Sequence, residues 1–184
     1  VEVKALTSSE EITHLGRHLS KMPLDVHMGK FLLVATLFKC LDPALTIAAA
    51  LNSKSPFMKP FGKELEADRA KQSFKLGDSD FLTIANAFNS FRRSTAQNYH
   101  RTFCNRNFLS IQNLLQIEEL RQQYFSYLID AGFVTVDETV RQELNKLRYR
   151  SGGSANYSKP RFLTIPAHLD VNSSSLAMIH ATLT

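Results

Sequence analysis

The stretch KCLDPALTIAAALNSKSPF, residues 39–57, constrains the fold most, because it holds the end of one helix and the start of another. Asp42 followed by Pro43 is a helix N-cap with proline at the first helical position, which predicts a helix to about Asn52. The alanines at 48–50 are small enough for a second helix to pack closely against this one. A Ser-Pro pair then interrupts the helical pattern. No catalytic group accompanies this corner, so its sequence predicts a scaffold.

Apolar residues recur at helical spacing along most of the remaining chain, with capping residues or glycines at the ends of the repeats. The longest segment with this helical spacing begins at Ser110 and ends at Gly132. Helices are expected over about 14–21, 26–38, 42–52, 62–75, 80–93, 95–107, 111–131 and 137–149, and from near 172 onward.

Residues 1–13 alternate, turn at 7–9 and resume, which predicts a short β-hairpin or wing. The segment SGGSANYSKP, residues 151–160, is the one low-complexity stretch and is expected to be flexible. The fold class expected is therefore mainly α, a helical bundle preceded by a short β-hairpin.

Composition indicates a globular chain of 184 residues, 43% hydrophobic and 21% charged, enough for one domain or one domain with part of another. The net charge of +5 permits a polyanionic partner. No apolar run approaches the ~20 residues that span a bilayer, so no membrane partner is expected. Cys40 and Cys104 are flanked by apolar residues, which indicates buried free thiols and a reducing compartment, the cytoplasm or the nucleus.

The chain starts at Val1 and stops inside an apolar-periodic run, so we expect it to be a piece of a longer protein. Its seven glycines form neither G-x-x-x-x-G-K-[ST] nor G-x-G-x-x-G, and no nucleophile motif surrounds any Ser, Cys or His. His14 and His18 are four residues apart but have no third ligand close in sequence, which favours solvated helix histidines over a metal site. We expect no catalytic residue, metal or cofactor within this chain.

The segment FRRSTAQNYHRTFCNRNFLSIQNL, residues 91–114, is the best candidate binding surface. Its arginines suit phosphate contacts, and its asparagines and glutamines suit backbone or base edges. The alternative is a solvated turn in which Phe103, Phe108 and Leu109 belong to the core. Both interpretations hold if the aromatic groups pack inside and the polar groups lie outside. A second basic cluster, over 141–161, is expected to be a mobile surface loop.

Five segments, in order, carry a resemblance to a known family: ITHLGRHLSKMPLDVHMGKFLL, CLDPALTIAAALNSKSPF, FGKELEADRAKQSF with GDSDFLTIANAF, FCNRNFLSIQNLLQIEELRQQYFSYLIDAGF and LDVNSSSLAMIHATL. Together they resemble the C-terminal helicase-associated region of DEAH/RNA-helicase-A-type ATP-dependent RNA helicases. The first resembles the family's passage from the winged helix into the next domain, the second its helical corner, and the last its final helix before an OB-fold. Phe81 and Asn113 stand where the family more often has His and Ser or Thr.

The resemblance implies that residues 1–22 end a winged-helix domain and residues 23–184 form a ratchet-like helical bundle. It also implies a parent enzyme, an ATP-dependent RNA helicase, whose ATP and Mg bind in RecA-like domains N-terminal to this region. The implied partners are single-stranded or structured RNA, the RecA-like domains and OB-fold of the same chain, and a ribosome or protein cofactor. Residue by residue, RNA contacts are implied for Arg101 (to a phosphate), Arg106, Asn107, Ser110 and Gln112.

On this interpretation the bundle forms part of an RNA channel wall and couples RNA passage to the motor. The alternative is a protein-docking helical adaptor within the same helicase. A free-standing winged-helix nucleic-acid binder ranks last, because no recognition helix precedes the wing in this chain.

Overall fold

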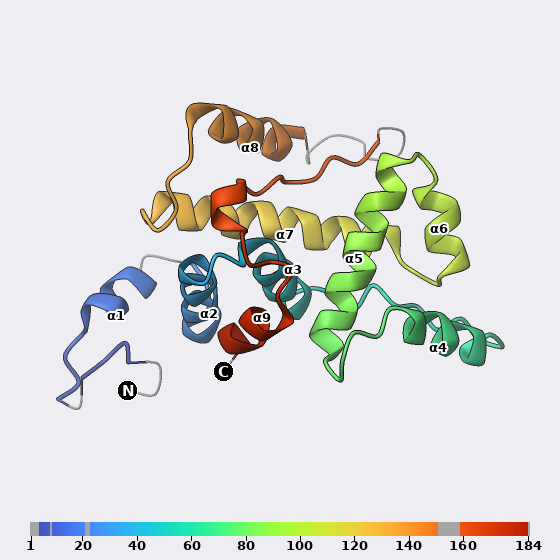
Figure 1. Cartoon of the computed structure of the whole chain (residues 1–184), viewed down its shortest axis with the longest axis horizontal. Helices are drawn as coiled ribbons and strands as arrows, with labels where there is room; N and C mark the ends of the chain where they lie inside the picture. Colours follow the sequence, from blue (N-terminus) through green and yellow to red (C-terminus); the bar gives the residue numbers. More distant parts are fainter. Residues whose placement is uncertain (1–3, 8, 21–22, 151–158, 184) are drawn as a thin grey trace. The chain divides into compact units, whose positions relative to one another are not determined.

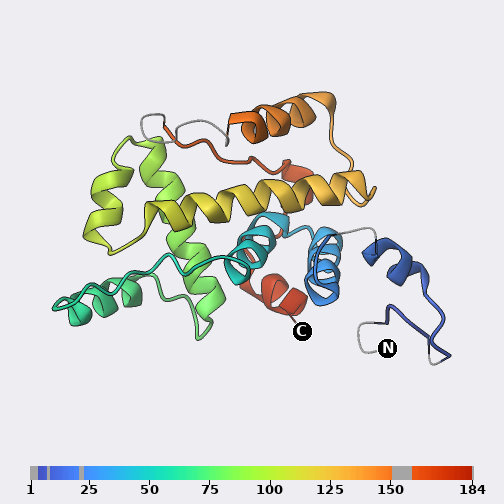
Figure 2. The same ribbon diagram turned by 180° about the vertical axis from the view of Figure 1, so that it is seen from behind.

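The computed structural model describes residues 4–7, 9–20, 23–150 and 159–183, and Figures 1 and 2 show the chain from opposite sides. The fold is mainly α-helical, as predicted, and no strand beyond isolated bridges occurs among these residues. The helices are α1 (His14–Leu19), α2 (Val26–Leu37), α3 (Leu41–Leu51), α4 (Glu64–Ser73), α5 (Asp80–Ala96), α6 (His100–Arg106), α7 (Ile111–Asp130), α8 (Glu138–Arg150) and α9 (Leu176–Leu183), with a 3₁₀ turn, η1, at Ala167–Leu169.

The chain divides into two compact units. The first comprises Val1–Leu45, Gln123–Leu144 and Thr164–Thr184, and the second comprises Thr46–Gln122 and Asn145–Leu163. The predicted domain boundary between residues 22 and 23 stays a prediction.

In the first unit, α2 begins where sequence capping rules place it. The Asp25 carboxylate accepts hydrogen bonds from the backbone N–H groups of His27 (2.9 Å) and Met28 (3.3 Å). Leu32 and Ala35 are fully buried on one face of the helix. The local signals in this stretch therefore suffice to form the helix.

The start of α3 differs from the prediction, because Asp42 is not its N-cap. The helix begins at Leu41, two residues before the predicted first helical residue, Pro43, and the Asp170 carboxylate accepts a hydrogen bond from the Asp42 N–H at 2.8 Å. Asn172 holds the same corner: its N–H donates to the Lys39 carbonyl and its side-chain amide to the Phe38 carbonyl, both at 2.8 Å. The segment LDVNSSSL thus caps the α2–α3 corner from about 130 residues away.

The hairpin predicted over residues 1–13 is not supported by the structure. Among the described residues of this stretch, pairing is limited to one antiparallel bridge between Leu6 and Ile12, with the Thr7 N–H donating to the Glu11 carbonyl at 2.8 Å. The first three residues lie outside the described part. Leu6 and Ile12 are both exposed, so the turn lacks the buried apolar face that would extend the pairing.

In the second unit, the predicted helix over 95–107 is wrong at its start. Helix α5 continues to Ala96, and α6 begins only at His100 after a break. Asn98 has a φ of 61°, a left-handed conformation that asparagine tolerates better than most residues. The break redirects the chain and leaves α6 as a short separate helix.

Candidate nucleic-acid interface

Helix α6 presents a polar face to solvent. Cys104 is fully buried on its inner face, whereas Arg101, Thr102, Asn105 and Arg106 are exposed. At 3.6 residues per turn, these four side chains occupy one arc of about 140°, with the two arginines at its edges. We call this set the α6 polar arc.

Two of the other predicted contact residues have structural roles. The Asn107 side-chain amide donates to the Phe103 carbonyl at 2.8 Å, in the last turn of α6. The Ser110 hydroxyl accepts a hydrogen bond from the Asn113 N–H at 3.2 Å and so caps α7. Gln112, in the first turn of α7, is exposed. The sequence therefore predicted polar groups around the α6–α7 connection, but two of these groups, Asn107 and Ser110, stabilise helix ends.

The arginines of the predicted binding segment, residues 91–114, do not share one environment. Arg92 is half-buried: its guanidinium donates to the Leu163 carbonyl at 3.4 Å and lies 5.9 Å from the centre of the Phe162 ring. Arg93 is exposed on the same helix. Arg92 thus helps to hold Phe162 and Leu163 in place and is not part of the α6 polar arc.

The connection between α6 and α7 is fixed by the loop that follows α3. The Met58 N–H donates to the Phe108 carbonyl and the Ser110 N–H donates to the Pro56 carbonyl, each at 2.8 Å. The Asn113 side chain adds a bond to a carbonyl of the same loop at 2.7 Å. The isolated antiparallel bridge between Phe57 and Leu109 joins segments about 50 residues apart, and nothing in the local sequence predicted it.

A buried ion pair supports the first half of α7. The side chains of Glu118 and Arg121 are 3% and 0% exposed, and Arg121 Nε lies 3.1 Å from a Glu118 carboxylate oxygen. Arg121 also donates to the Thr46 hydroxyl, and its guanidinium carbon lies 5.1 Å from the centre of the Phe88 ring. Three separate segments of the second unit therefore meet at one guanidinium group.

The Glu118 carboxylate also ties down the segment after residue 158. It accepts hydrogen bonds from the Leu163 N–H and from the Gln122 side chain (3.1 Å). Burial raises the pKa of the Glu118 carboxyl, and Arg121 is the strongest group opposing that rise. Nothing in the sequence pattern predicted this buried pair, because a Glu and an Arg three residues apart on a helix usually form a solvated surface pair.

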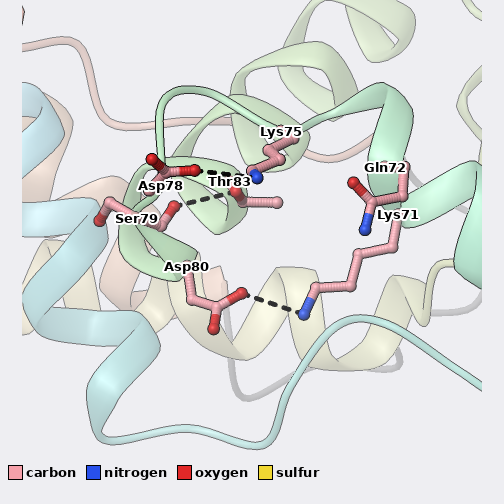
Figure 3. Close-up of a pocket in the computed structure, with 7 residues that line it drawn as sticks. All are labelled: Lys71, Gln72, Lys75, Asp78, Ser79, Asp80 and Thr83. Carbon is pink, nitrogen blue, oxygen red and sulfur yellow. Dashed lines mark hydrogen bonds and ion pairs between the residues drawn. The ribbon is translucent and has the colours of Figure 1, made fainter.

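An open pocket of about 230 Å³ lies where α4 ends and α5 begins (Figure 3). Two ion pairs cross it, Lys71 with Asp80 at 3.1 Å and Lys75 with Asp78 at 3.0 Å. Because each lysine already faces a carboxylate, the pocket offers little net charge to a phosphate. Its lining residues are Lys71, Gln72, Lys75, Asp78, Ser79, Asp80 and Thr83.

Cys40 and Cys104 are buried free thiols, as predicted. Burial raises the pKa of the Cys104 thiol to about 12, which keeps it protonated and unreactive. Within the described ranges, no three His, Cys, Asp or Glu side chains cluster closely enough to hold a metal ion. None of the helices described in the structure is long and apolar enough to cross a membrane.

The prediction of a mobile loop over 141–161 is wrong for residues 141–150, which belong to helix α8, where Arg141 and Lys146 are exposed. The low-complexity stretch at 151–158 lies outside the described residues.

Comparison with known proteins places the chain in a family. Residues 25–110 match the model described as the helicase associated domain (HA2), ratchet-like. The chain is 42% identical over 138 residues to the ATP-dependent DNA/RNA helicase DHX36 of Bos taurus, which covers 73% of this chain and 14% of the relative. It is 41% identical over 149 residues to the DExH-box ATP-dependent RNA helicase DExH1 of Arabidopsis thaliana (80% and 15%), and 38% identical over 139 residues to the ATP-dependent RNA helicase DHX29 of Homo sapiens (74% and 10%).

The chain is therefore a helicase-associated fragment with a ratchet-like domain. It belongs to the DEAH-type RNA helicase family, as its sequence motifs indicated. The matched region spans only 10% to 15% of the length of these three relatives.

Proposed function

We propose that this chain forms part of the RNA channel wall of an ATP-dependent RNA helicase and couples RNA passage to a motor elsewhere in the parent protein. The observation that carries the proposal is the α6 polar arc, with Arg101 and Arg106 exposed at its edges and Gln112 exposed at the start of α7. Guanidinium groups bind phosphates through paired hydrogen bonds, and amides suit base or sugar edges.

The proposal extends to the parent protein. ATP and Mg would bind in RecA-like domains, and an OB-fold would follow this region. Residues 1–22 would end a winged-helix domain, and residues 23–184 would form the ratchet-like bundle. We propose the cytoplasm as its compartment, with the nucleus compatible.

Binding through phosphates would suit a channel wall, because phosphate contacts do not depend on base sequence and let the strand advance. Such a wall must also be rigid while the motor moves. The hydrogen bonds between residues 56–58 and 108–110, and the buried Glu118–Arg121 pair, supply that rigidity in the second unit.

A salt titration tests the proposal. If about three phosphates are neutralised, the log–log slope of affinity against salt for a labelled single-stranded RNA is about −2, from ~0.7 counterions released per contact. The double variant Arg101→Ala with Arg106→Ala should flatten the slope by about one unit. Arg141→Ala with Lys146→Ala removes the same charge from exposed positions on α8 and should leave the slope nearly unchanged.

A second candidate function, a protein-docking adaptor within the helicase, is favoured by apolar exposure in the first unit. Leu37 is 79% exposed and Val171 is 65% exposed. These side chains flank the α2–α3 corner, since the residue after Val171 bonds to the carbonyl groups of residues 38 and 39. If the arginine double variant binds RNA with an unchanged slope, the adaptor function takes the lead.

A further inference from the structure

The loop between α3 and α4 displays a completely exposed aromatic side chain. Phe61 is 100% exposed and sits at the second position of a tight turn in which the Lys63 N–H donates to the Pro60 carbonyl at 3.1 Å. Gly62, the third residue of the turn, has a φ of 79°, as a type II β-turn requires. The turn residues therefore specify the conformation that holds the ring in solvent.

The loop that carries this turn is anchored at its base. Phe57 packs against Phe74 (ring centres 6.2 Å apart), and Phe74 packs against Phe103 of α6 (6.1 Å). The backbone hydrogen bonds to the carbonyl and N–H groups of residues 108 and 110 hold the same end. Burial of a phenylalanine side chain normally stabilises a protein, and this chain leaves that stabilisation unused at Phe61.

The charge around the ring is mixed, with lysines in the loop and one carboxylate at the turn: Glu64 accepts a hydrogen bond from the Gly62 N–H at 3.0 Å. Residues 53–63, SKSPFMKPFGK, contain Lys54, Lys59 and Lys63 and no acidic residue. Lys59 is paired with Asp68 at 2.6 Å, whereas Lys54 and Lys63 are exposed. An exposed aromatic ring beside lysines is the pattern by which proteins bind single strands without reading sequence, through stacking and phosphate attraction.

We propose that Phe61 is a stacking platform for a base of single-stranded RNA, with Lys54 and Lys63 contacting neighbouring phosphates. The inference rests on the proposed function and adds a second contact point to the α6 polar arc. Continuity supports it, since the loop is hydrogen-bonded to the connection that joins α6, which carries the α6 polar arc, to α7.

A protein partner is the competing occupant of this surface. Leu65 is 76% exposed on α4 and would enlarge an apolar docking patch around Phe61. However, Leu65 stands in sequence between two exposed carboxylates, Glu64 and Glu66, which repel phosphates, whereas Phe61 stands between Lys59 and Lys63. RNA stacking should therefore depend on the ring at position 61 and not on the side chain at position 65.

The absence of tryptophan from the sequence permits a direct measurement. In a Phe61→Trp variant the introduced indole is the sole tryptophan of the chain, so a base that stacks on it quenches its fluorescence. The probe is a single-stranded RNA of about ten nucleotides, within the range covered by known stacking grooves. Saturable quenching with the same midpoint as anisotropy of the labelled RNA is the expected result, and no quenching at saturating RNA would overturn the proposal.

Affinity measurements separate an aromatic from a merely apolar requirement. Phe61→Ala and Phe61→Leu should each weaken binding about tenfold with an unchanged salt slope, because stacking neutralises no phosphate. Leu65→Ala is the matched control and should bind as the unaltered chain does. Circular dichroism checks folding, which these exposed positions should leave intact.

The outcomes distinguish the two proposals. If Phe61→Leu binds like the unaltered chain, or Leu65→Ala weakens binding as much as Phe61→Ala, the stacking platform is refuted and a protein-docking patch is indicated. If the Phe61 variants weaken binding but the α6 arginine variants do not, the platform holds and the polar arc fails. An unaltered chain that does not bind RNA overturns both.

Discussion

Replacing Arg121 with leucine should destabilise the second unit strongly. The Arg121 and Glu118 side chains are 0% and 3% exposed, so water screens neither charge. The variant leaves the Glu118 carboxylate buried without its ion-pair partner, with Arg92 as the remaining cation that acts on it, and loss of a buried partner typically costs ~3–5 kcal/mol. With an m-value of about 2 kcal/mol per M of urea, the midpoint of unfolding should fall by about 2 M. Urea titration followed by circular dichroism measures the shift.

The loss should also depend on pH, with a definite sign. Burial raises the pKa of Glu118 and Arg121 opposes that rise, so removal of Arg121 lifts the folded-state pKa further above the unfolded value. The folded variant then binds more protons than the unfolded chain, and its stability falls as pH rises through the raised pKa. The deficit relative to the unaltered chain should therefore be smallest near pH 4, close to the ordinary glutamate pKa of ~4.3, and largest at neutral pH.

Two companion variants make this prediction sharp. The double variant Glu118→Leu with Arg121→Leu removes both charges and should cost less than Arg121→Leu alone. Glu119→Gln changes an exposed neighbour and should stay within about 0.5 kcal/mol of the unaltered chain. A midpoint for Arg121→Leu within about 0.5 M of the unaltered chain would refute the reasoning, as would a loss of equal size at every pH.

Two further predictions concern a helix cap and a histidine. Asp170→Ala should lower stability by about 1 kcal/mol, and Tm by about 2–4 °C, because it removes the carboxylate that caps α3. Ser174→Ala changes an exposed neighbour and should leave Tm unchanged. Calorimetry measures both variants, and equal Tm values would argue against the cap. Burial lowers the pKa of His100, and the charges of Arg101 and Lys159 lower it further. In an NMR titration the midpoint of protonation of the His100 ring should therefore lie below pH 6.5. Arg101→Gln should move this midpoint upward. Because the folded pKa is depressed, the stability that His100 contributes is present above pH 6.5 and lost as pH falls; a midpoint at or above 6.5 would contradict this.

Local signals predicted the helices well, and the errors have a common physical cause. Asp25 caps α2 as its sequence indicates, because the N–H groups it accepts from lie two and three residues away. Asp42 looks like an equally good cap, but the fold supplies Asp170 instead. A side chain distant in sequence can replace a local cap only after the chain has folded, so propensity rules place the start of α3 two residues late.

The candidate site shows the same division. Exposure of Arg101, Arg106 and Gln112 agrees with a polar outer surface, since only Cys104 and Leu109 are buried between residues 101 and 112. Arg92 belongs to the same sequence cluster, yet it turns toward the carbonyl of residue 163. Charge patterning along the chain cannot separate the two cases, because the partner of Arg92 is 71 residues away.

Phe61 and the α6 polar arc lie on different elements, and backbone hydrogen bonds join those elements. Met58, three residues before Phe61, donates to the carbonyl of residue 108, two residues after α6 ends. A strand that touched both surfaces would therefore meet a platform and an arginine pair held at a fixed separation, with little entropy left to lose on binding. Such preorganisation would let a ratchet-like wall hold RNA through a few contacts while each contact stays weak enough to release the strand.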